Sequence, residues 1–359
     1  MVKSLKRNKV ELSNEGLYTD NAINSIDYKE EAHVLNCASL CSGISADKEA
    51  MKNIALNNNT KYIIEIDAQA REIYQLNHGQ PEKVYEDITK VNATKLAKVD
   101  FMMISVPCQS YSLQNRNRSN YCATKDSLWE SALQILDKSN SKYFIFENVE
   151  GLLSIQGGKV FQDILDSFKA LNYNIKYKVL NAKDYGSPQN RKRLFIVGVR
   201  KDIKKDFSFP QPQLVKSSVN DVIKIGSDYS AQLYDASKRV PFQEKRSTDI
   251  KKLYILPHLK YAADARIVSS NGVAPTIVAS SAYTKFYDEK NHLFRYLTNT
   301  ELAEIQGFKN FKFSTKKMKT KQLIGNSISV QVLEAILQEL IPPKYFEQTA
   351  TNHKLGVAA

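Results

Sequence analysis

The chain has 359 residues, of which 42% are hydrophobic and 25% are charged. This composition is typical of a globular protein and excludes a collagen-like or wholly disordered chain. Lysine and arginine number 51 against 38 aspartates and glutamates, a net charge of +13. Such an excess favours nucleic acid, an anionic membrane surface or an acidic substrate as the partner.

Residues 1–32 are polar and rich in charge, and we expect them to form a flexible arm. A second interpretation is a basic arm that contacts phosphate through Lys3, Lys6, Arg7 and Lys9. We expect no secretion signal and no membrane span, because the required apolar runs are missing. Four cysteines without a CxxC pair favour neither a disulfide scaffold nor a zinc site. We therefore expect an intracellular protein with reduced thiols and no metal.

Strands and helices are predicted to alternate from His33 to Arg200. The strands are predicted over residues 33–40, 61–66, 99–106, 142–149, 173–182 and 192–200. The helices are predicted over residues 47–56, 67–76, 127–139 and 159–171. This spacing is typical of βαβ units and predicts an α/β fold with a mainly parallel sheet, covered on both faces. Ligands of such sheets bind beyond the carboxyl ends of the strands.

The alternation stops after Arg200, where we expect a second, smaller and irregular domain. Residues 308–321 carry six lysines and no acid, which favours a phosphate-facing stripe over a reader of sequence. Helical spacing returns at 327–340, and the chain is expected to end in a weakly structured tail.

Two residues with catalytic potential follow buried strands. Cys108 lies on the loop after the strand at 99–106, behind Pro107, whose ring suits a rigid loop. A thiol there can act as a nucleophile, or it can be a buried structural cysteine. Glu147 ends another apolar strand, where burial would raise its pKa and make it an acid. The alternative is a helix-capping or solvated carboxylate.

Two further segments have chemistry that suits anions. Residues 189–193 bring three basic side chains to the start of a strand, which suits phosphate or an anionic intermediate, or a solvated edge. Residues 325–327 are predicted to open a helix, whose N-terminus suits a carboxylate or phosphate. Asparagine and serine are also ordinary helix caps.

A ligand site is also predicted at the first two strand ends. Gly43 lies in the turn after the first strand and lets the backbone approach a ligand, although a full GxGxxG pattern is missing. Glu65 ends the second strand, where a carboxylate can bind ribose hydroxyls. Asp87 follows a short segment and can accept from an adenine amine.

In their order along the chain, these motifs resemble one family, the bacterial and phage DNA (cytosine-5)-methyltransferases. The resemblance spans about residues 34–200 and 266–340. It is carried by PCQSYS (107–112), ENVEG (147–151), AKDYGSPQNRKRLFIVG (182–198), GNSISV (325–330), and the late segments ARIVSSNGVAPTIVAS (265–280) and LTNTELAEIQGF (297–308).

The resemblance implies a class I methyltransferase fold: a doubly wound, mainly parallel Rossmann-like sheet with a smaller, irregular target-recognition domain. Residues 33–200 and 322–345 would form the catalytic domain that binds S-adenosylmethionine. Residues 201–321 would form the DNA-binding domain, and 346–359 the tail. Duplex DNA would lie in the cleft between the domains.

The implied reaction transfers a methyl group to carbon 5 of a cytosine that is flipped out of duplex DNA, leaving S-adenosyl-L-homocysteine. By resemblance, the Cys108 thiolate adds to carbon 6 and protonated Glu147 bonds ring nitrogen 3. Arg193 would bond the carbonyl oxygen at carbon 2, and Arg191 would position the backbone or the Cys108 loop. No metal is implied.

The resemblance also assigns binding residues. The cofactor set is Leu40, Cys41, Ser42, Gly43, Ile44, Glu65, Ile66, Asp87, Pro107, Leu128, Asn326 and Ser327. The DNA set is Gln109, Ser112, Gln189, Arg239, Lys245 and Arg246. Two residues depart from the family pattern: Cys41 replaces an aromatic residue and Ser45 replaces a glycine, which predicts weaker cofactor binding.

The family context implies a monomer in the cytoplasm of a bacterium or phage-infected cell, with a role in restriction-modification or in protection of a phage or mobile element. A cognate restriction endonuclease acting on the same site is a candidate partner. A tRNA cytosine-5 methyltransferase of the same family and a non-catalytic DNA-binding homologue remain alternatives. A Rossmann oxidoreductase is disfavoured by the missing GxGxxG.

Overall fold

The computed structural model describes residues 33–107, 127–213, 216–242, 249–259, 265–280, 284–313 and 317–347. These residues belong to one compact unit. None of the helices in these ranges is long and apolar enough to cross a membrane.

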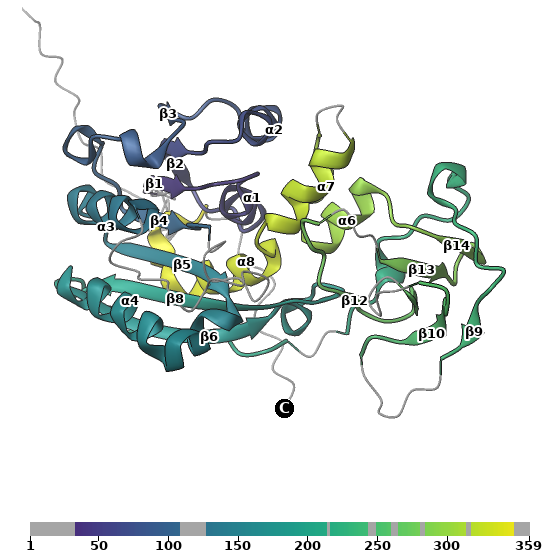
Figure 1. Cartoon of the computed structure of the whole chain (residues 1–359). Helices are drawn as coiled ribbons and strands as arrows, with labels where there is room; N and C mark the ends of the chain where they lie inside the picture. Colours follow the sequence, from purple (N-terminus) through teal and green to yellow (C-terminus); the bar gives the residue numbers. More distant parts are fainter. Residues whose placement is uncertain are drawn as a thin grey trace, which may run out of the picture. The chain divides into compact units, whose positions relative to one another are not determined.

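A seven-stranded sheet forms the centre of the first part of the chain (Figure 1). Its strands, in spatial order, are β3 (Val84–Tyr85), β2 (Asn58–Ile64), β1 (Leu35–Leu40), β4 (Phe101–Ile104), β5 (Tyr143–Val149), β8 (Lys192–Arg200) and β6 (Tyr173–Asn181). Strand β8 runs antiparallel to both of its neighbours, and the other pairs are parallel. The expected mainly parallel sheet is therefore confirmed.

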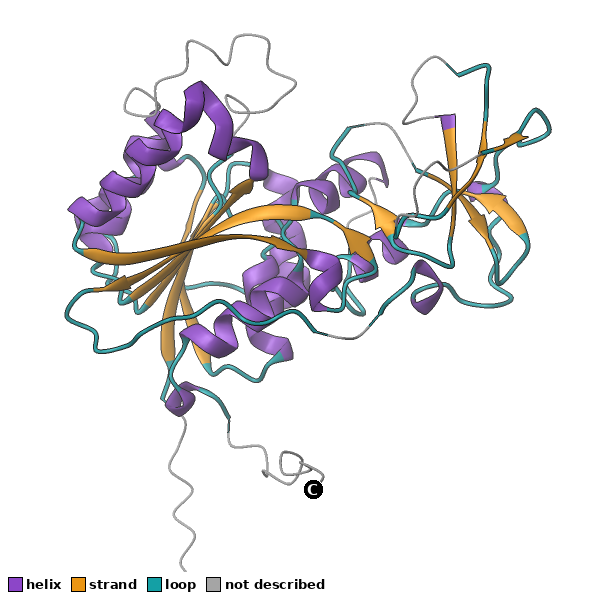
Figure 2. Cartoon of the chain, turned by 90° about the horizontal axis from the view of Figure 1, so that it is seen from below, coloured by secondary structure: helices purple, strands orange, loops and turns teal. Residues whose placement is uncertain are grey.

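Helices cover both faces of this sheet (Figure 2). Alternate residues of β1 supply the two cores, because successive side chains of a strand point to opposite faces. Leu35 and Cys37 pack in one core, and Ala38 and Leu40 pack in the other. The first core takes side chains from α1 (Ala46–Asn53), α2 (Ala68–His78) and α8 (Val330–Leu340), and the second from α3 (Ser127–Ser139) and α4 (Lys159–Ala170).

The chain after Arg200 builds a second, five-stranded sheet. Its order is β14 (Leu293–Arg295), β13 (Lys285–Asp288), β11 (Arg266–Ser269), β10 (Lys252–Ile255) and β9 (Val240–Pro241). A two-residue parallel pair, β7 (Gln189–Asn190) with β12 (Ala274–Pro275), joins the segment before β8 to the later part of the chain. Helices α6 (Asn299–Ile305) and α7 (Lys317–Asn326) follow β14.

Two boundaries differ from the sequence predictions. The helix predicted from residue 327 begins at Val330 with Ser329 as its N-cap, so Gly325 and Asn326 form the last turn of α7 instead of opening a helix. The extended backbone of Ser329 separates the two helices. The predicted tail begins with an ordered contact, because Phe346 bridges to Leu56; the rest of the tail and the N-terminal arm lie outside the described residues.

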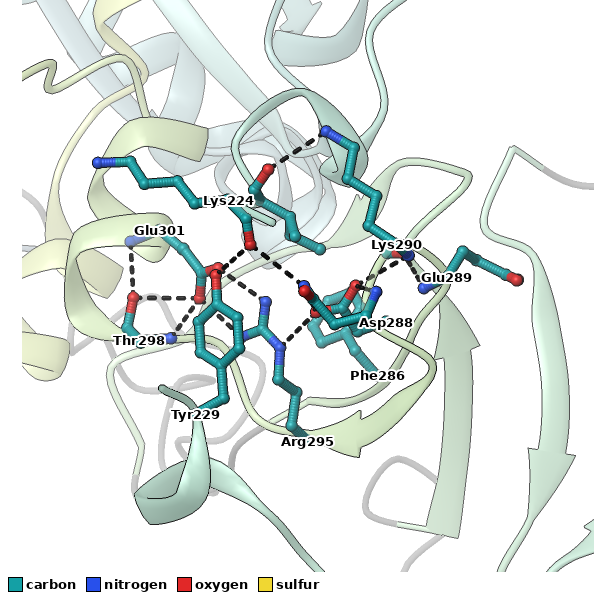
Figure 3. Close-up of polar contacts among 12 residues, drawn as sticks. Lys224, Tyr229, Phe286, Asp288, Glu289, Lys290, Arg295, Thr298 and Glu301 are labelled. Carbon is teal, nitrogen blue, oxygen red and sulfur yellow. Dashed lines mark hydrogen bonds and ion pairs between the residues drawn. The ribbon is translucent and has the colours of Figure 1, made fainter. Parts of the chain in front are cut away.

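A buried ion cluster joins the second sheet to α6 (Figure 3). The Arg295 side chain is fully buried and donates to Asp288 at 2.7 Å and to the two oxygens of Glu301 at 2.7 and 2.8 Å. The Tyr229 ring lies over the guanidinium, 3.7 Å from its central carbon. The cluster links β13, β14 and α6 through charges that are paired inside the protein.

Candidate active site

A cavity of about 570 Å³ opens at the carboxyl ends of β1, β2, β4 and β5. Its volume lies in the range of small-molecule sites, and its position is where open α/β sheets bind ligands. The lining comes from the turn after β1, from the ends of β2 and β5, and from the α7–α8 connection. One site therefore collects residues separated by almost 300 positions in the sequence.

The turn after β1 approaches the cavity with its backbone in an unusual conformation. Cys41, Gly43 and Ser45 have φ values of 53°, 53° and 57°. The Gly43 N–H donates to Glu65 Oε2 at 2.6 Å, which ties this turn to the end of β2. Burial, with Glu65 nearby, raises the pKa of Cys41 to about 12, so its thiol stays neutral near pH 7.

Acidic side chains line the cavity beside β2 and β3. Glu65 also accepts from the Asp67 N–H at 2.8 Å, and burial raises the pKa of its carboxyl. Asp87 accepts from the Thr89 hydroxyl and N–H at 2.7 and 3.0 Å, and these bonds lower its pKa. Ile66 also lines the cavity while 74% exposed, which leaves an apolar surface free at the rim.

Glu147 and Arg193 form the polar part of the lining at β5 and β8. Glu147 Oε1 lies 3.3 Å from Arg193 Nε. Burial raises the pKa of Glu147, although Arg193 and Arg191 oppose the shift. A carboxyl whose protonated form is favoured by burial can donate a hydrogen bond or a proton to a ligand.

Arg191 fastens three segments together from inside the protein. Its side chain is buried and donates to the backbone oxygens of Ile277 at 3.0 Å, Gly325 at 3.0 Å and Ser327 at 2.6 Å. These contacts agree with the expectation that Arg191 positions backbone segments, and Arg191 also lines the cavity. Its guanidinium satisfies carbonyl groups at the end of α7, where Asn326 and Ser327 line the cavity.

Most predicted cofactor residues share this cavity. The lining includes Cys41, Ser42, Gly43, Glu65, Ile66, Asp87, Pro107, Leu128, Asn326 and Ser327. Leu40 and Ile44 are not in the lining, and their side chains pack in the two cores because the sheet and α1 bury them. Burial of these two side chains leaves only their backbone atoms for the predicted cofactor contact.

Of the residues predicted to contact DNA, Gln189 and Arg239 lie in the described ranges. Gln189 is fully buried and its Oε1 accepts from the Ile277 N–H at 3.0 Å, so the described structure does not expose it for the expected DNA contact. Arg239 is exposed and lies over the rings of Phe294 and Tyr254, at 4.5 and 5.3 Å. The other residues predicted to contact DNA lie outside the described ranges: Gln109, Ser112, Lys245 and Arg246. Cys108, the proposed nucleophile, also lies outside them.

The sequence did not single out several lining residues. Asp47 lies in the first turn of α1, where an acidic residue is ordinary, so nothing in its position signalled a cavity. Leu323 and Ile328 flank the Gly325–Ser327 motif, and their apolar character signalled a core position. Asn148, next to Glu147 in the ENVEG motif, is predicted from the sequence to hold a loop, and the structure places it in the cavity lining.

Comparison with known proteins gives one family. A family model described as C-5 cytosine-specific DNA methylase matches residues 35–342. The Type II methyltransferase M.NgoBI of Neisseria gonorrhoeae is 28% identical over 297 residues, covering 82% of this chain and 90% of that protein. The Type II methyltransferase M.HhaI of Haemophilus parahaemolyticus is 28% identical over 284 residues, covering 77% and 85%.

Solved structures share the fold. The S. pombe Dnmt2 methyltransferase superposes with a TM-score of 0.65 at 19% identity, covering 86% of this chain and 99% of that one. A protein of an E. coli prophage, named a putative DNA modification methyltransferase, gives a TM-score of 0.63 at 21% identity, covering 85% of this chain and 98% of that one.

Proposed function

Because the chain belongs to the C-5 cytosine-specific DNA methylase family, we propose that it methylates carbon 5 of one cytosine within a short sequence of duplex DNA, with S-adenosylmethionine as donor. The family makes it a DNA cytosine-C5 methyltransferase that uses S-adenosylmethionine. The proposed parts are the choice of one cytosine within a short sequence of duplex DNA, the roles of the individual residues and the biological role.

The observation that carries the proposal is the cavity. It combines Glu65 and Asp87 at the ends of β2 and β3 with the Glu147–Arg193 pair at β5 and β8. Pro107, the residue before Cys108, also lines it. The carboxylates of Glu65 and Asp87, which can accept hydrogen bonds from a nucleoside, therefore line the same cavity as the Glu147 carboxyl, which can act as an acid.

The lining fits S-adenosylmethionine, which is both apolar and charged. Ile66, Pro107 and Leu128 supply apolar surface for the adenine. We assign Glu65 to the ribose hydroxyls and Asp87 to the adenine amine. The Ser42 hydroxyl is buried and has no partner among the described residues, as expected of a group that awaits a ligand. When bound, the cofactor supplies an electrophilic methyl group.

The protein groups would activate the cytosine in two stages. The Cys108 thiolate forms a bond to carbon 6, while protonated Glu147 bonds nitrogen 3 and stabilises the electron density that moves into the ring. Arg193 bonds the carbonyl oxygen at carbon 2. Carbon 5 would then gain the methyl group, with S-adenosylhomocysteine as the leaving group. Its proton would pass to solvent water while the bond between carbon 6 and Cys108 breaks and the thiolate is released.

The curated relatives suggest the biological role. M.NgoBI and M.HhaI carry Type II names, and a 32% identical relative over 193 residues is the orphan methyltransferase of Bacillus phage rho11s. We propose a protective role in restriction-modification or in a phage or mobile element, in a cytoplasm that holds the DNA.

The test is a labelling experiment with the purified full chain. Methyl-labelled S-adenosylmethionine is incubated with unmethylated mixed-sequence duplex DNA, with tRNA in parallel, and the nucleosides are analysed. We expect 5-methylcytosine in DNA, and its loss in Cys108→Ala while DNA binding persists.

Label in tRNA alone would replace the DNA substrate with RNA. Undiminished transfer by Cys108→Ala would remove Cys108 as nucleophile. Absence of label in both substrates, with folded protein, would support a non-catalytic homologue.

A further inference from the structure

One carboxylate in the cavity has no role in the proposed reaction and forms no ion pair with any residue that the structure describes. Asp47 lines the cavity from the first turn of α1 and is 5% exposed. Its carboxylate accepts from the hydroxyl of Ser39 in β1. Among the residues that the structure describes, no cation pairs with it. The adjacent Lys48 instead donates to Asn58.

The other acidic groups of the lining are already partnered. They are Glu65 with two backbone N–H groups, Asp67 with Lys319 at 3.0 Å, Glu86 with Arg71 at 2.8 Å, Asp87 with Lys90 at 3.4 Å, and Glu147 with Arg193 at 3.3 Å. Asp47 differs from these acidic groups in two ways. Among the described residues, no cation forms an ion pair with it, and no two N–H groups of another segment donate to it.

A buried carboxylate without a counter-charge is costly, and a ligand that brings a cation would offset the cost. Burial raises the pKa of Asp47, whereas the Ser39 hydroxyl, nearby backbone N–H groups and the charge of Lys48 oppose the shift. A bound cation would favour the ionised form.

The proposed function leaves one part of the cavity for the amino-acid end of the cofactor. Its nucleoside is assigned to Glu65 and Asp87, and its methyl group must face Glu147. The lining residues without an assigned role include Ser42 and Asp47 after β1 and Ser327 in the α7–α8 connection. The amino-acid end carries an ammonium group, which can supply a cation for Asp47, because Arg191 of the same lining bonds backbone carbonyl groups instead.

On the basis of the proposed function, we propose that Asp47 binds the ammonium group of the cofactor's amino-acid end. Asp47 is then a binding residue that discriminates between ligands with and without this amino group. The contact adds a charge-assisted hydrogen bond at a carboxylate that is only 5% exposed, where such bonds are strong.

The test compares two ligands by titration calorimetry. One is S-adenosylhomocysteine, and the other is its deaminated analogue, which lacks only the amino group. Wild type should bind S-adenosylhomocysteine about tenfold more tightly or better, which corresponds to about 1.4 kcal/mol. Asp47→Asn, which removes the charge at nearly constant shape, should lose most of that preference. Its affinity for the deaminated analogue should stay within about twofold of wild type.

Two further variants separate charge from structure. Glu82→Gln makes the same charge change on an exposed carboxylate outside the cavity and should leave both affinities unchanged. Asp47→Ser keeps an oxygen near the start of α1 and should behave like Asp47→Asn, so it replaces that variant if the asparagine is not tolerated.

The outcomes are distinguishable. Equal loss of affinity for both ligands in the Asp47 variants would assign Asp47 a structural role and overturn the inference. A preference that survives in these variants would overturn it as well. Wild type that methylates DNA but binds the two ligands equally would overturn this inference alone. Wild type that binds neither ligand would overturn the proposed cofactor site together with it.

Discussion

Two side chains in the turn after β1 occupy a backbone region that suits glycine. Cys41 and Ser45 have φ values of 53° and 57°, and a Cβ in this region costs about 1–2 kcal/mol per residue. The Ser45 hydroxyl is also buried without a partner among the described residues. This conformation of the turn therefore lowers the stability of the protein, and Ser45 contributes through both its backbone strain and its unpaired hydroxyl.

We therefore predict that Ser45→Gly stabilises the protein. The relief of backbone strain and of the buried hydroxyl exceeds the added entropy of the unfolded chain, about 0.4–1 kcal/mol, and the net gain should be about 1 kcal/mol. Urea unfolding measures it. The control Ser131→Gly, in the regular helix α3, should destabilise by about 0.5–1 kcal/mol. A lower midpoint for Ser45→Gly would contradict the prediction.

A second prediction at this scale concerns acid stability. His78 is 1% exposed and packs against the rings of Tyr74 and Phe311, with Glu49 4.0 Å away. Burial, with Lys48 and Lys52 nearby, lowers the pKa of His78 from 6.5 to about 3. Folding therefore excludes a proton that the unfolded chain binds below pH 6.5. The resulting stability is present above that pH and is lost as pH falls toward about 3, by up to about 1.4 kcal/mol per pH unit.

His78→Phe should flatten this acid limb, because a phenyl ring has no proton to bind. Urea unfolding between pH 4 and 7 measures the slope, with His258→Phe, at an exposed position, as the control. An acid limb of unchanged slope in His78→Phe would assign the acid sensitivity to other groups.

At the scale of elements, the end of α7 is packed directly on the segment after β12. A Cβ added to Gly325 would lie 2.5 Å from the backbone carbon of Val278 and 2.6 Å from the Ala279 nitrogen. Arg191 bonds carbonyl groups on both sides of this contact, at Ile277 and Gly325. Backbone meets backbone here, so neither side can yield by rotating a side chain.

Gly325→Ala should therefore be destabilising by about 1–3 kcal/mol and should weaken S-adenosylhomocysteine binding, since it displaces Asn326 and Ser327 in the cavity. Thermal unfolding and calorimetry measure the two effects. Gln322→Ala, at an exposed position of the same helix, should change stability by less than about 0.5 kcal/mol. Wild-type stability and affinity in Gly325→Ala would show that the contact relaxes freely.

Comparison of the predicted elements with the observed ones shows which features of the fold and the site could be predicted from the sequence. Strand–helix alternation and strand-end motifs predicted the sheet and most of the cavity, because these features depend on local patterns. The predicted start of α8 was wrong by three residues: the helix begins at Val330, and the Ser329 side chain at its N-cap makes no capping hydrogen bond, so the sequence held no capping signal for this start. The contacts of Arg191 reach residues 86 and 136 positions away, and no local pattern encodes them. The same holds for Asp47, whose position in the sequence looks like an ordinary helix start.

At the scale of the whole molecule, the net charge of +13 predicts salt-sensitive binding to DNA. The lysines of the segment at 308–321 are not equally available for contacts with DNA phosphates. Lys321 is buried and donates to the Ser280 carbonyl, and Lys319 pairs with Asp67. Lys309 and Lys312 are exposed, so they remain the candidates for phosphate contacts within the described part of this segment.

The double variant Lys309→Gln, Lys312→Gln should bind DNA more weakly, and its dependence of log affinity on log salt should become shallower by up to about 2. Binding isotherms between 50 and 300 mM salt measure this. The control Lys176→Gln removes a lysine that pairs with Asp206 and should leave the slope unchanged. An unaltered slope in the double variant would remove the segment from the DNA interface.

The Arg295 cluster has a consequence for how this sequence can evolve. Loss of one partner would leave an unpaired buried charge at a cost of about 3–5 kcal/mol, a large share of the 5–15 kcal/mol by which domains are stable. Asp288, Arg295 and Glu301 therefore cannot be exchanged one at a time. Across related sequences these three positions should covary, with all three charges kept or all three replaced by neutral residues.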